Sequence, residues 1–306
     1  MNKNNQRIHD FLSKYVNLPD PNYAVLLTGV WGCGKTYFVE KWKDVLSTSI
    51  SEDKESTVLK PVYVSLFGLS SIAEINQAVT REIYPFMKSK LYNLGKATIN
   101  AVSSVAFNCD ISKITKDRLK GEVNLELDIV SLFKSDRTIG ENRIIIFDDF
   151  ERCKAPVVDL LGYINTFVEH SNIRVILICN EAVFEEEDRK DDKKLYESFK
   201  EKVVGRVFKV EPDVEAAIDY FCVNSPFIQL TDEQKNIAAD AFRKTGYDNL
   251  RLLYQSLQDF GLLCEKLKYD NNVVRQKRII DGLLIQYIVA YNEYAKSDKV
   301  KKNGAV

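Results

Sequence analysis

Short apolar runs separated by amphipathic stretches dominate the pattern of hydrophobic and polar positions along the chain. The runs are rich in β-branched residues, and most contain few polar ones, which is typical of parallel strands buried on both faces. Between them, apolar residues recur at helical spacing. The runs are Ala24–Leu27, Pro61–Phe67, Ile144–Phe147, Ile173–Cys179 and a short run within Phe199–Val210. Strands alternating with helices predict an α/β fold with a parallel sheet flanked by helices.

The same pattern divides the chain into a sheet part and a helical part. Residues 1–212 contain all of these runs, with a mixed stretch at 87–134 that predicts a helical insertion. Residues 213–295 show only helical spacing and predict a helical lid that follows the sheet domain. The lysine-rich residues 296–306 predict a flexible tail.

The first apolar run leads into Gly29-x-x-x-x-Gly34-Lys35-Thr36, and a helical pattern follows. This is the spacing of a phosphate-binding loop, in which glycines let backbone N–H groups face a phosphate at a helix start. Lys35 supplies a charge for the β- and γ-phosphates, and Thr36 supplies a hydroxyl ligand for Mg²⁺. The residues expected to contact the nucleotide are Gly29, Trp31, Gly32, Cys33, Gly34, Lys35, Thr36 and Tyr37.

The third run ends in the carboxylate pair Asp148-Asp149. Asp148 at the end of a buried strand can hold Mg²⁺ opposite Thr36. Asp149 can accept the proton of an attacking water. A structural alternative is that Asp149 or Glu151 pairs with Arg152 and shapes the turn, and the sequence leaves the role of Glu151 open.

Two further features can be assigned to the same site. Asn180 follows the fourth run, where its side chain could hold the attacking water, and the alternative is a helix N-cap. A short amphipathic helix is predicted over residues 5–16. It either covers the edge of the sheet or forms a wall beside the nucleotide base.

Composition and charge narrow the class of protein. The 306 residues carry a net charge of −1, so no global field attracts nucleic acid. Six cysteines lie far apart and only two histidines exist, which argues against a zinc site and for buried thiols in a reducing cytoplasm. The apolar stretch Ala97–Cys109 is short and interrupted by polar residues, so we do not expect a membrane helix.

The loop Gly29–Thr36 with Trp31, together with the run Ile145–Cys153, resembles the KAP family of P-loop NTPases. The resemblance covers roughly residues 20–260. It implies the additional-strand P-loop class near the AAA+ and STAND ATPases, with ATP and Mg²⁺ as cofactors and nucleotide-controlled assembly. Relatives include bacterial phage-exclusion proteins and membrane-associated scaffolds. The chain departs from the family in two ways. Glu151 replaces an aspartate of the family pattern. Many relatives carry membrane helices inserted in the NTPase domain, whereas this chain has only the weak stretch Ala97–Cys109, so membrane attachment is not carried over.

The resemblance also implies a role for Arg251. Asn249 or Asp248 is the predicted cap of a helix, and Arg251 falls in its first turn, where the helix dipole disfavours a cation. An anionic partner would compensate for this position. In the additional-strand class a lid arginine reaches the γ-phosphate, and the Asn-Leu-Arg run resembles that second sensor. The alternative is a surface salt bridge.

Arg206 is a candidate for a contact between subunits. In AAA+-like relatives an arginine near this point enters the site of the neighbouring subunit, where it would make hydrolysis depend on assembly. Arg206 sits just before the fifth predicted strand. The alternatives are pairing with Glu201 or Glu211 in its own chain, or that Lys200 or Lys202 takes the role.

These patterns support function hypotheses of different classes. The first is a Mg²⁺-dependent ATPase that switches an assembly in antiviral defence, forming a homo-oligomer through its NTPase domain and acting on an effector protein. The second is a structural or regulatory module that binds ATP and hydrolyses it negligibly. A small-molecule kinase is a third possibility, but the sequence contains no recognisable acceptor site.

Overall fold

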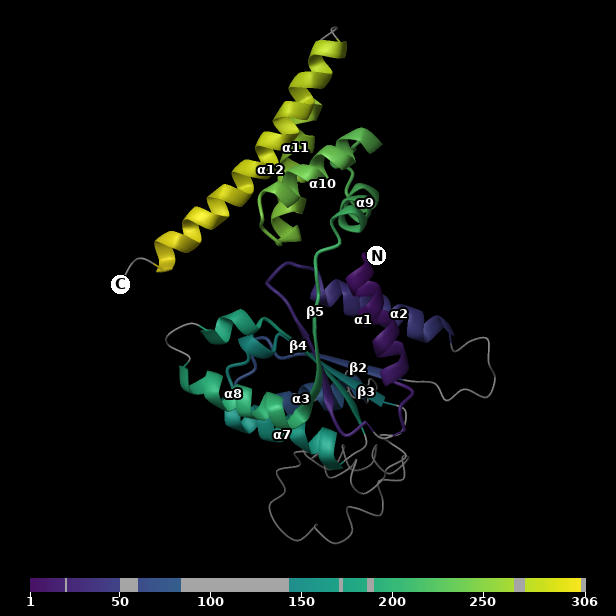
Figure 1. Cartoon of the computed structure of the whole chain (residues 1–306), viewed down its shortest axis with the longest axis vertical. Coiled ribbons are helices and arrows are strands. Elements are labelled where there is room, and N and C mark those ends of the chain that lie inside the picture. Colours follow the sequence, from purple (N-terminus) through teal and green to yellow (C-terminus); the bar gives the residue numbers. More distant parts are fainter. Residues whose placement is uncertain are drawn as a thin grey trace, which may run out of the picture.

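The computed structural model describes residues 1–19, 21–49, 60–83, 143–170, 173–185, 190–266 and 273–303. The predicted insertion at 87–134 and the stretch Ala97–Cys109 lie outside the described residues. The described residues form a sheet with helices on both faces, followed by helices that pack on one another (Figure 1).

The sheet is parallel throughout, with its strands in the order β2-β3-β4-β1-β5. The strands are β1 (Ala24–Thr28), β2 (Lys60–Ser65), β3 (Arg143–Asp148), β4 (Arg174–Cys179) and β5 (Val204–Lys209). β4 therefore separates β1 from β3, and the carboxyl ends of these strands meet at one edge of the sheet. This arrangement confirms the predicted fold class.

Burial explains which strands occupy the centre. Every residue of β4 is buried, as are Ala24–Leu27 of β1, whereas β2 and β5 at the edges have exposed residues. Fully burying a large aliphatic side chain contributes roughly 1.5–3 kcal/mol, so uninterrupted apolar runs favour the interior. The runs that contain Lys60 or Arg206 and Lys209 form the edges.

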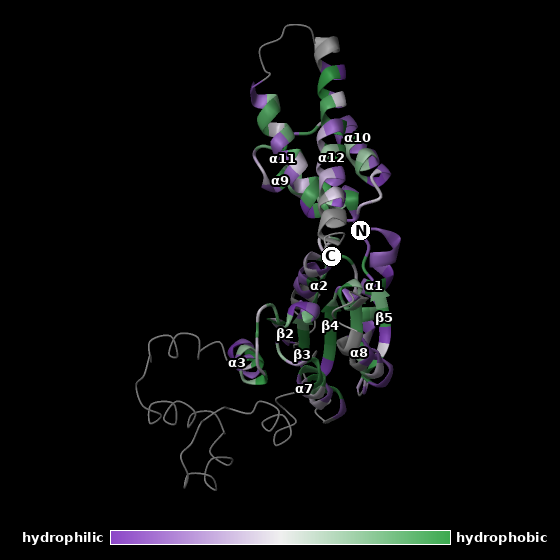
Figure 2. Cartoon of the chain, turned by 90° about the vertical axis from the view of Figure 1, so that its left-hand side faces the viewer, coloured by the Kyte–Doolittle hydropathy of each residue, from purple (hydrophilic) through white to green (hydrophobic). Residues whose placement is uncertain are grey.

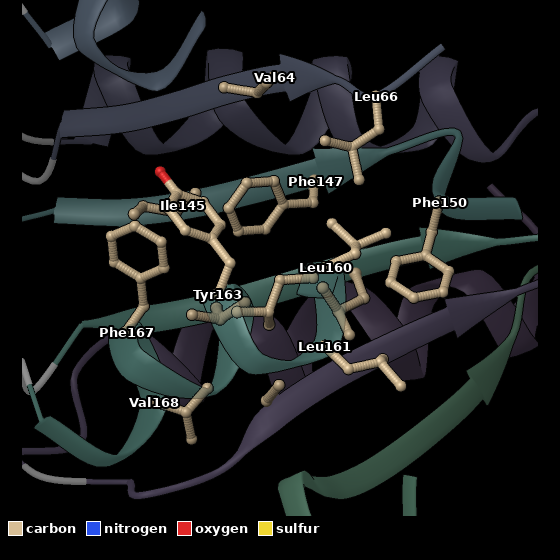
Figure 3. Packing of buried hydrophobic residues seen from close by; sticks show 14 of the residues in the cluster. Val64, Leu66, Ile145, Phe147, Phe150, Leu160, Leu161, Tyr163, Phe167 and Val168 are labelled. Carbon is tan, nitrogen blue, oxygen red and sulfur yellow. The ribbon is translucent and has the colours of Figure 1, made fainter. Parts of the chain in front are cut away.

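Helices cover both faces of the sheet, with α3, α7 and α8 on one face and α1 and α2 on the other (Figure 1). Figure 3 shows the first face, where Phe147 of β3 packs against Phe167 of α7 with ring centroids 6.1 Å apart. Two short 3-10 helices, η3 and η4, follow β3 and β4. The elements are α1 (Lys3–Tyr15), α2 (Lys35–Ser49), α3 (Ile72–Ile83), α7 (Val157–His170), α8 (Lys190–Val203), η3 (Phe150–Arg152) and η4 (Glu181–Glu185).

α1 is attached both to the sheet and to the segment that follows β5. The Asn2 side chain caps α1 by accepting the Asn5 N–H at 2.8 Å. The Asn5 side chain donates to the Glu211 carbonyl at 2.8 Å and accepts the Glu211 N–H at 3.2 Å. At the other end of α1, the Tyr15 hydroxyl donates to the Tyr23 carbonyl at 2.7 Å. α1 thus packs on the face of the sheet over β1 and β4, and its predicted role beside the base stays a prediction.

The helices after β5 enclose a hydrophobic core of their own, which includes Phe242, Leu257 and Phe260. We call them the lid helices. They are α9 (Val214–Asn224), α10 (Asp232–Lys244), α11 (Leu250–Lys266) and α12 (Val273–Asn303). α10 begins with a capping box between Thr231 and Gln234.

α12 is longer than the sequence predicts, because it continues to Asn303 where a flexible tail was expected from residue 296. Lys296 Nζ donates to the Thr245 carbonyl at 2.6 Å and holds this part of α12 against the end of α10. Lysines near a helix C-terminus also interact favourably with the helix dipole. Polar and apolar residues mix along α12 (Figure 2). No helix in the described ranges combines the length and the apolar character needed to cross a bilayer.

Candidate nucleotide-binding site

The loop between β1 and α2 has the backbone that phosphate binding requires. Gly32 and Gly34 have φ angles of 83° and 98°, in the left-handed region that side chains disfavour. A Cβ atom at Gly29 would lie 2.8 Å from the Cys33 sulfur and 3.0 Å from the Val210 carbonyl oxygen. Only glycine fits these positions without strain, as expected for a loop that wraps closely around a phosphate.

Lys35 begins α2 and folds back into the loop. Its ammonium donates hydrogen bonds to the carbonyls of Gly29 at 2.5 Å and Val30 at 3.2 Å, and the residue is buried. A buried cation is costly unless hydrogen bonds satisfy it, so these carbonyls hold the charge inside the loop. The site therefore presents the single positive charge that a phosphate-binding loop needs.

Thr36 and Asp148, the predicted metal ligands, lie together. Thr36 Oγ1 donates to Asp148 Oδ2 at 2.7 Å, and Asp148 is only 3% exposed at the end of β3. The other carboxylate oxygen accepts the Asp149 N–H at 2.7 Å. A hydroxyl and a carboxylate are the oxygen donors that Mg²⁺ prefers, so the residues present fit this ion.

Tyr63 of β2 is a member of the site that the sequence did not reveal. Its hydroxyl donates to Asp148 Oδ2 at 2.5 Å. Burial raises the pKa of Tyr63, and the neighbouring Asp148 carboxylate raises it further, so the hydroxyl stays protonated and acts as a donor. The contact depends on β2 lying beside β3, where Tyr63 pairs with Ile146.

Asp149 adjoins Asp148, but its side chain has different partners. Asp149 Oδ2 accepts a hydrogen bond from Ser65 Oγ at 2.9 Å, and Oδ1 lies 3.6 Å from Arg152 Nη1. Its φ angle of 56° places a non-glycine residue in the left-handed region, at a cost of roughly 1–2 kcal/mol. The pairing with Arg152 that the sequence allowed is therefore present, and strained backbone accompanies it, as is common at functional sites.

The predicted nucleotide contacts Trp31, Cys33 and Tyr37 have different surroundings. The Trp31 indole N–H donates to Glu151, which follows β3. Cys33 is buried inside the loop, and burial raises the pKa of its thiol, so it remains neutral. The Tyr37 ring packs edge-on against Tyr220 of α9, with centroids 5.1 Å apart, and so contacts the lid helices.

Asn180 lies at the carboxyl edge of the sheet. It follows β4, the strand between β1 and β3, and is 6% exposed. Its carbonyl accepts the Val183 N–H at 3.2 Å at the start of η4. Asn180 therefore lies at the start of a short helix and near the carboxyl ends of β1 and β3, the strands that lead to the phosphate loop and to Asp149.

Arg206 lies inside β5, whereas the sequence placed it before the strand. It pairs in register with Val25, near the start of β1, because β5 already begins at Val204. The side chain is exposed on the edge strand and donates to its own neighbour, the Gly205 carbonyl, at 2.8 Å. The described residues show no ion pair from Arg206 to either candidate glutamate.

The lysines that were alternatives to Arg206 are engaged in ion pairs within the chain. Lys200 Nζ lies 2.5 Å from Glu181 Oε1, and Lys202 Nζ lies 3.1 Å from Glu169 Oε1. Both lysines belong to α8, on the face of the sheet that α7 also covers.

The lid helices contact the phosphate loop directly. The Leu250 N–H donates to the Gly32 carbonyl at 2.9 Å, and the Asn249 side chain packs against Gly32 so closely that a Cβ there would clash with it. Asn249 also caps α11 by accepting the Arg251 N–H at 3.0 Å. Arg251 is therefore an exposed residue in the first turn of a helix that begins on the loop.

The comparisons with known proteins agree with this fold. The KAP family P-loop domain matches residues 5–290. The comparison with curated proteins found no match. The Aeropyrum pernix ORC2 protein in its ADP form is similar in structure, with a TM-score of 0.54 at 14% identity, covering 94% of this chain and 67% of that one. The Aeropyrum pernix ORC1 protein in complex with DNA has a TM-score of 0.50 at 14% identity, covering 98% and 66%.

The chain thus spans about two thirds of these structures, and at such identities the likeness concerns the fold alone. The family match covers most of the chain and includes the loop and the carboxylate strand. From this match and the geometry of the loop, the chain is a nucleotide-binding protein that belongs to the KAP family of P-loop NTPases.

Proposed function

We propose that the chain is a Mg²⁺-dependent ATPase whose nucleotide state controls an assembly. The observation that carries the proposal is the hydrogen bond of 2.7 Å between Thr36 Oγ1 and Asp148 Oδ2. It joins a loop hydroxyl to a buried carboxylate at the carboxyl edge of the sheet, and P-loop NTPases use such a pair to hold Mg²⁺. Lys35 supports the proposal because it is the adjacent residue and its charge is held inside the loop.

Each residue then has a chemical task. Thr36 and Asp148 would hold Mg²⁺, which when bound supplies positive charge to the phosphate oxygens. Lys35 would exchange its two loop carbonyls for phosphate oxygens. Asp149 would accept the proton of the attacking water at its carboxylate, and Asn180 would orient that water from the end of β4.

The contact between the loop and the lid helices favours a switch over a simple hydrolase. Leu250 and Asn249 both contact Gly32, so a change in loop shape would alter their support. Arg251 follows in the same helical turn and would bind the γ-phosphate when the lid helices close. Arg251→Ala should leave the lid helices equally sensitive to protease with and without ATP, whereas ATP should protect the unaltered chain.

A second candidate function is an ATP-binding regulatory module that hydrolyses ATP negligibly. The observation that favours it is the state of Asp149, whose two carboxylate oxygens face Ser65 and Arg152. Both oxygens of this candidate base already have partners within the chain, so fewer of its acceptor positions are available to an attacking water. The two functions share nucleotide binding and differ in turnover.

The assembly that we propose is a homo-oligomer formed through the sheet domain, residues 1–212, with residues 213–295 as its lid. Arg206 supports this, because it is exposed on the edge strand β5 without an acidic partner among the described residues. A guanidinium presented to a neighbouring site would stabilise charge on its γ-phosphate. A role in antiviral defence with an effector protein extends the proposal and rests on the resemblance to phage-exclusion relatives.

Phosphate release and particle mass test the proposal together. We expect the purified chain to release phosphate from ATP only with Mg²⁺, and mass photometry to show a larger particle with ATP and Mg²⁺ than without. Nucleotide binding without phosphate release would favour the regulatory module. The absence of ATP binding would contradict both functions, and an unchanged particle mass would contradict the assembly switch.

A further inference from the structure

A cluster of aromatic and charged side chains lies beside the phosphate loop, outside the chemistry described above. Trp31 comes from the loop, Glu151 and Arg152 come from η3, and Phe67 follows β2. The Trp31 indole N–H donates to Glu151 Oε1 at 2.7 Å. The Arg152 guanidinium carbon lies 4.0 Å from the centre of the Phe67 ring and 5.8 Å from that of Trp31. The cluster therefore joins the loop to the segment after β3.

The hydrogen bond between Trp31 and Glu151 crosses from the surface into the interior. Trp31 is 43% exposed, whereas Glu151 is only 3% exposed. A buried carboxylate needs hydrogen-bond donors to offset its lost hydration, so the indole N–H has a strong preference for this position. The ring of Trp31 is thus partly exposed to solvent, while its Nε1 atom is hydrogen-bonded to a buried carboxylate.

At the loop end of this link, Lys35 contacts the backbone beside Trp31. Lys35 Nζ donates to the Val30 carbonyl at 3.2 Å, and that carbonyl belongs to the peptide bond that leads into Trp31. When Lys35 turns to a phosphate, this carbonyl loses the ammonium and keeps only the Cys33 N–H, which it accepts at 3.3 Å. Trp31 is then the first side chain whose position depends on whether the loop holds nucleotide.

The other end of the link reaches the candidate base. Arg152 Nη1 lies 3.6 Å from Asp149 Oδ1, and the same guanidinium is close enough to the Trp31 ring for a cation–π attraction. A displacement of Trp31 therefore changes the support of the guanidinium that faces Asp149.

We propose that Glu151 is a positioning residue that couples the shape of the phosphate loop to Asp149 through Trp31 and Arg152. The coupling rests on the proposed function, because it requires nucleotide to enter the loop. In the absence of nucleotide, Trp31 and Arg152 keep Asp149 against the guanidinium. Nucleotide moves the peptide before Trp31, the indole shifts about its bond to Glu151, and Arg152 releases the carboxylate.

Tryptophan emission can follow the first step directly. The chain has two tryptophans, and the second, Trp42, is buried with an indole N–H that has no hydrogen-bond partner among the described residues. Trp42→Phe therefore leaves Trp31 as the single reporter without removing a hydrogen bond. We expect the emission of this variant to change in step with the binding of a fluorescent ATP analogue, measured in parallel.

In this background, Glu151→Ala should remove most of the ATP-induced change in emission, because the indole N–H then has lost its buried acceptor. Glu151→Gln keeps an oxygen acceptor and should retain most of the change. Glu181→Ala is the matched control, because the partners of Glu181 among the described residues are Tyr196 and Lys200, and not Trp31. A Glu151→Ala response equal to that of the control would overturn the proposal.

Arg152→Ala tests the second half of the link and leaves the buried carboxylate in place, so it serves even where Glu151→Ala does not fold. Turnover should rise about tenfold while ATP affinity stays within about twofold, because Asp149 then no longer has to leave the guanidinium before it acts as a base. Unchanged turnover would overturn the coupling. Analogue binding without any change in Trp31 emission would overturn the coupling alone, whereas the absence of analogue binding would overturn the proposed function and the coupling with it.

Discussion

The backbone N–H of Leu250 donates a hydrogen bond of 2.9 Å to the carbonyl of Gly32, so α11 begins on the phosphate loop itself. Asn249 packs its side chain against the same glycine and caps the same helix. The lid helices therefore rest on the part of the loop that has to adapt to a phosphate. A small side chain added at Gly32 should therefore separate α11 from the phosphate loop.

Gly32→Ala is the first prediction. The new methyl group meets the Asn249 side chain, so amide hydrogens in α11 should exchange faster than in the parent chain, by about tenfold. Gly68→Ala is the matched control, since Gly68 has a similar φ angle of 79° but its Cβ would meet nothing within 4 Å. Equal exchange rates in the two variants would contradict the link between loop and lid helices.

The second prediction concerns Lys35. Lys35→Ala removes the charge that the loop holds for the β- and γ-phosphates, and ATP affinity should drop tenfold or more, ~1.4 kcal/mol. Titration with a fluorescent ATP analogue measures this. Lys193→Ala is a suitable control, because Lys193 pairs on the exposed face of α8 with Glu197 at 3.9 Å. A folded Lys35→Ala chain with unchanged affinity would be incompatible with the assigned role of the loop.

The third prediction separates the two carboxylates. Asp149→Asn keeps the shape and a hydrogen-bonding group but loses basicity, so hydrolysis should fall by a factor on the order of 10² while ATP stays bound. Asp148→Asn should instead weaken the Mg²⁺-dependent part of ATP binding, because Asp148 is the residue bonded to Thr36. Both quantities are measured for both variants. If the two variants behave alike, the division of roles is wrong.

The fourth prediction concerns Tyr63. Tyr63→Phe keeps the ring but removes the hydroxyl that donates to Asp148 Oδ2. Losing a hydrogen bond to a charged group costs about 1.5 kcal/mol, so the Mg²⁺ concentration needed for half-maximal ATP binding should rise roughly tenfold. Tyr196→Phe removes a hydroxyl from another carboxylate, Glu181, and is the control. A similar Mg²⁺ requirement in both variants would leave Tyr63 without a role at the metal ligands.

The fifth prediction concerns Arg206 and assembly. Arg206→Ala and Lys35→Ala should each be inactive alone, the first because it lacks the arginine presented to the neighbour and the second because it lacks a working loop. Mixed, they should regain part of the activity, since some interfaces then join an intact loop to an intact arginine.

The mixing experiment needs both variants to assemble, which mass photometry establishes first. Full activity of Arg206→Ala alone would show that the residue is dispensable. Assembled mixtures that recover no phosphate release would exclude a contribution in trans. Lys202→Ala is the control, because Lys202 forms an ion pair with Glu169 of its own chain.

The sequence was informative where the signal is local. The apolar runs and the loop spacing each depend on residues that are close in the chain, and each was found in the structure. Thr36 and Asp148 could be paired in advance because parallel strands bring their carboxyl ends to one edge. The length of α12 was misjudged, because the Lys296 contact that holds it involves a distant residue, Thr245.

The hydrogen-bond partners of Asp148 and Asp149 on β2 could not be predicted from the sequence. Tyr63 and Ser65 act on Asp148 and Asp149 because β2 lies next to β3, and pairing of strands is not visible in either run alone. The position of Arg206 inside β5 depends on where pairing with β1 begins. For the same reason, the bond from Trp31 to Glu151 joins residues 120 positions apart and has no local signal.

The two hydrogen bonds between Asn5 and Glu211 restrict the segment that connects the sheet to the lid helices. One side-chain amide satisfies both the N–H and the carbonyl of Glu211, as a neighbouring strand would. The next residue is Pro212, whose ring fixes φ, and Asp213 is already the cap of α9. Any swing of the lid helices that preserves these bonds is confined to a few torsion angles between Glu211 and Val214. The connection between the two parts of the chain thus has few free torsion angles and is not a loose tether.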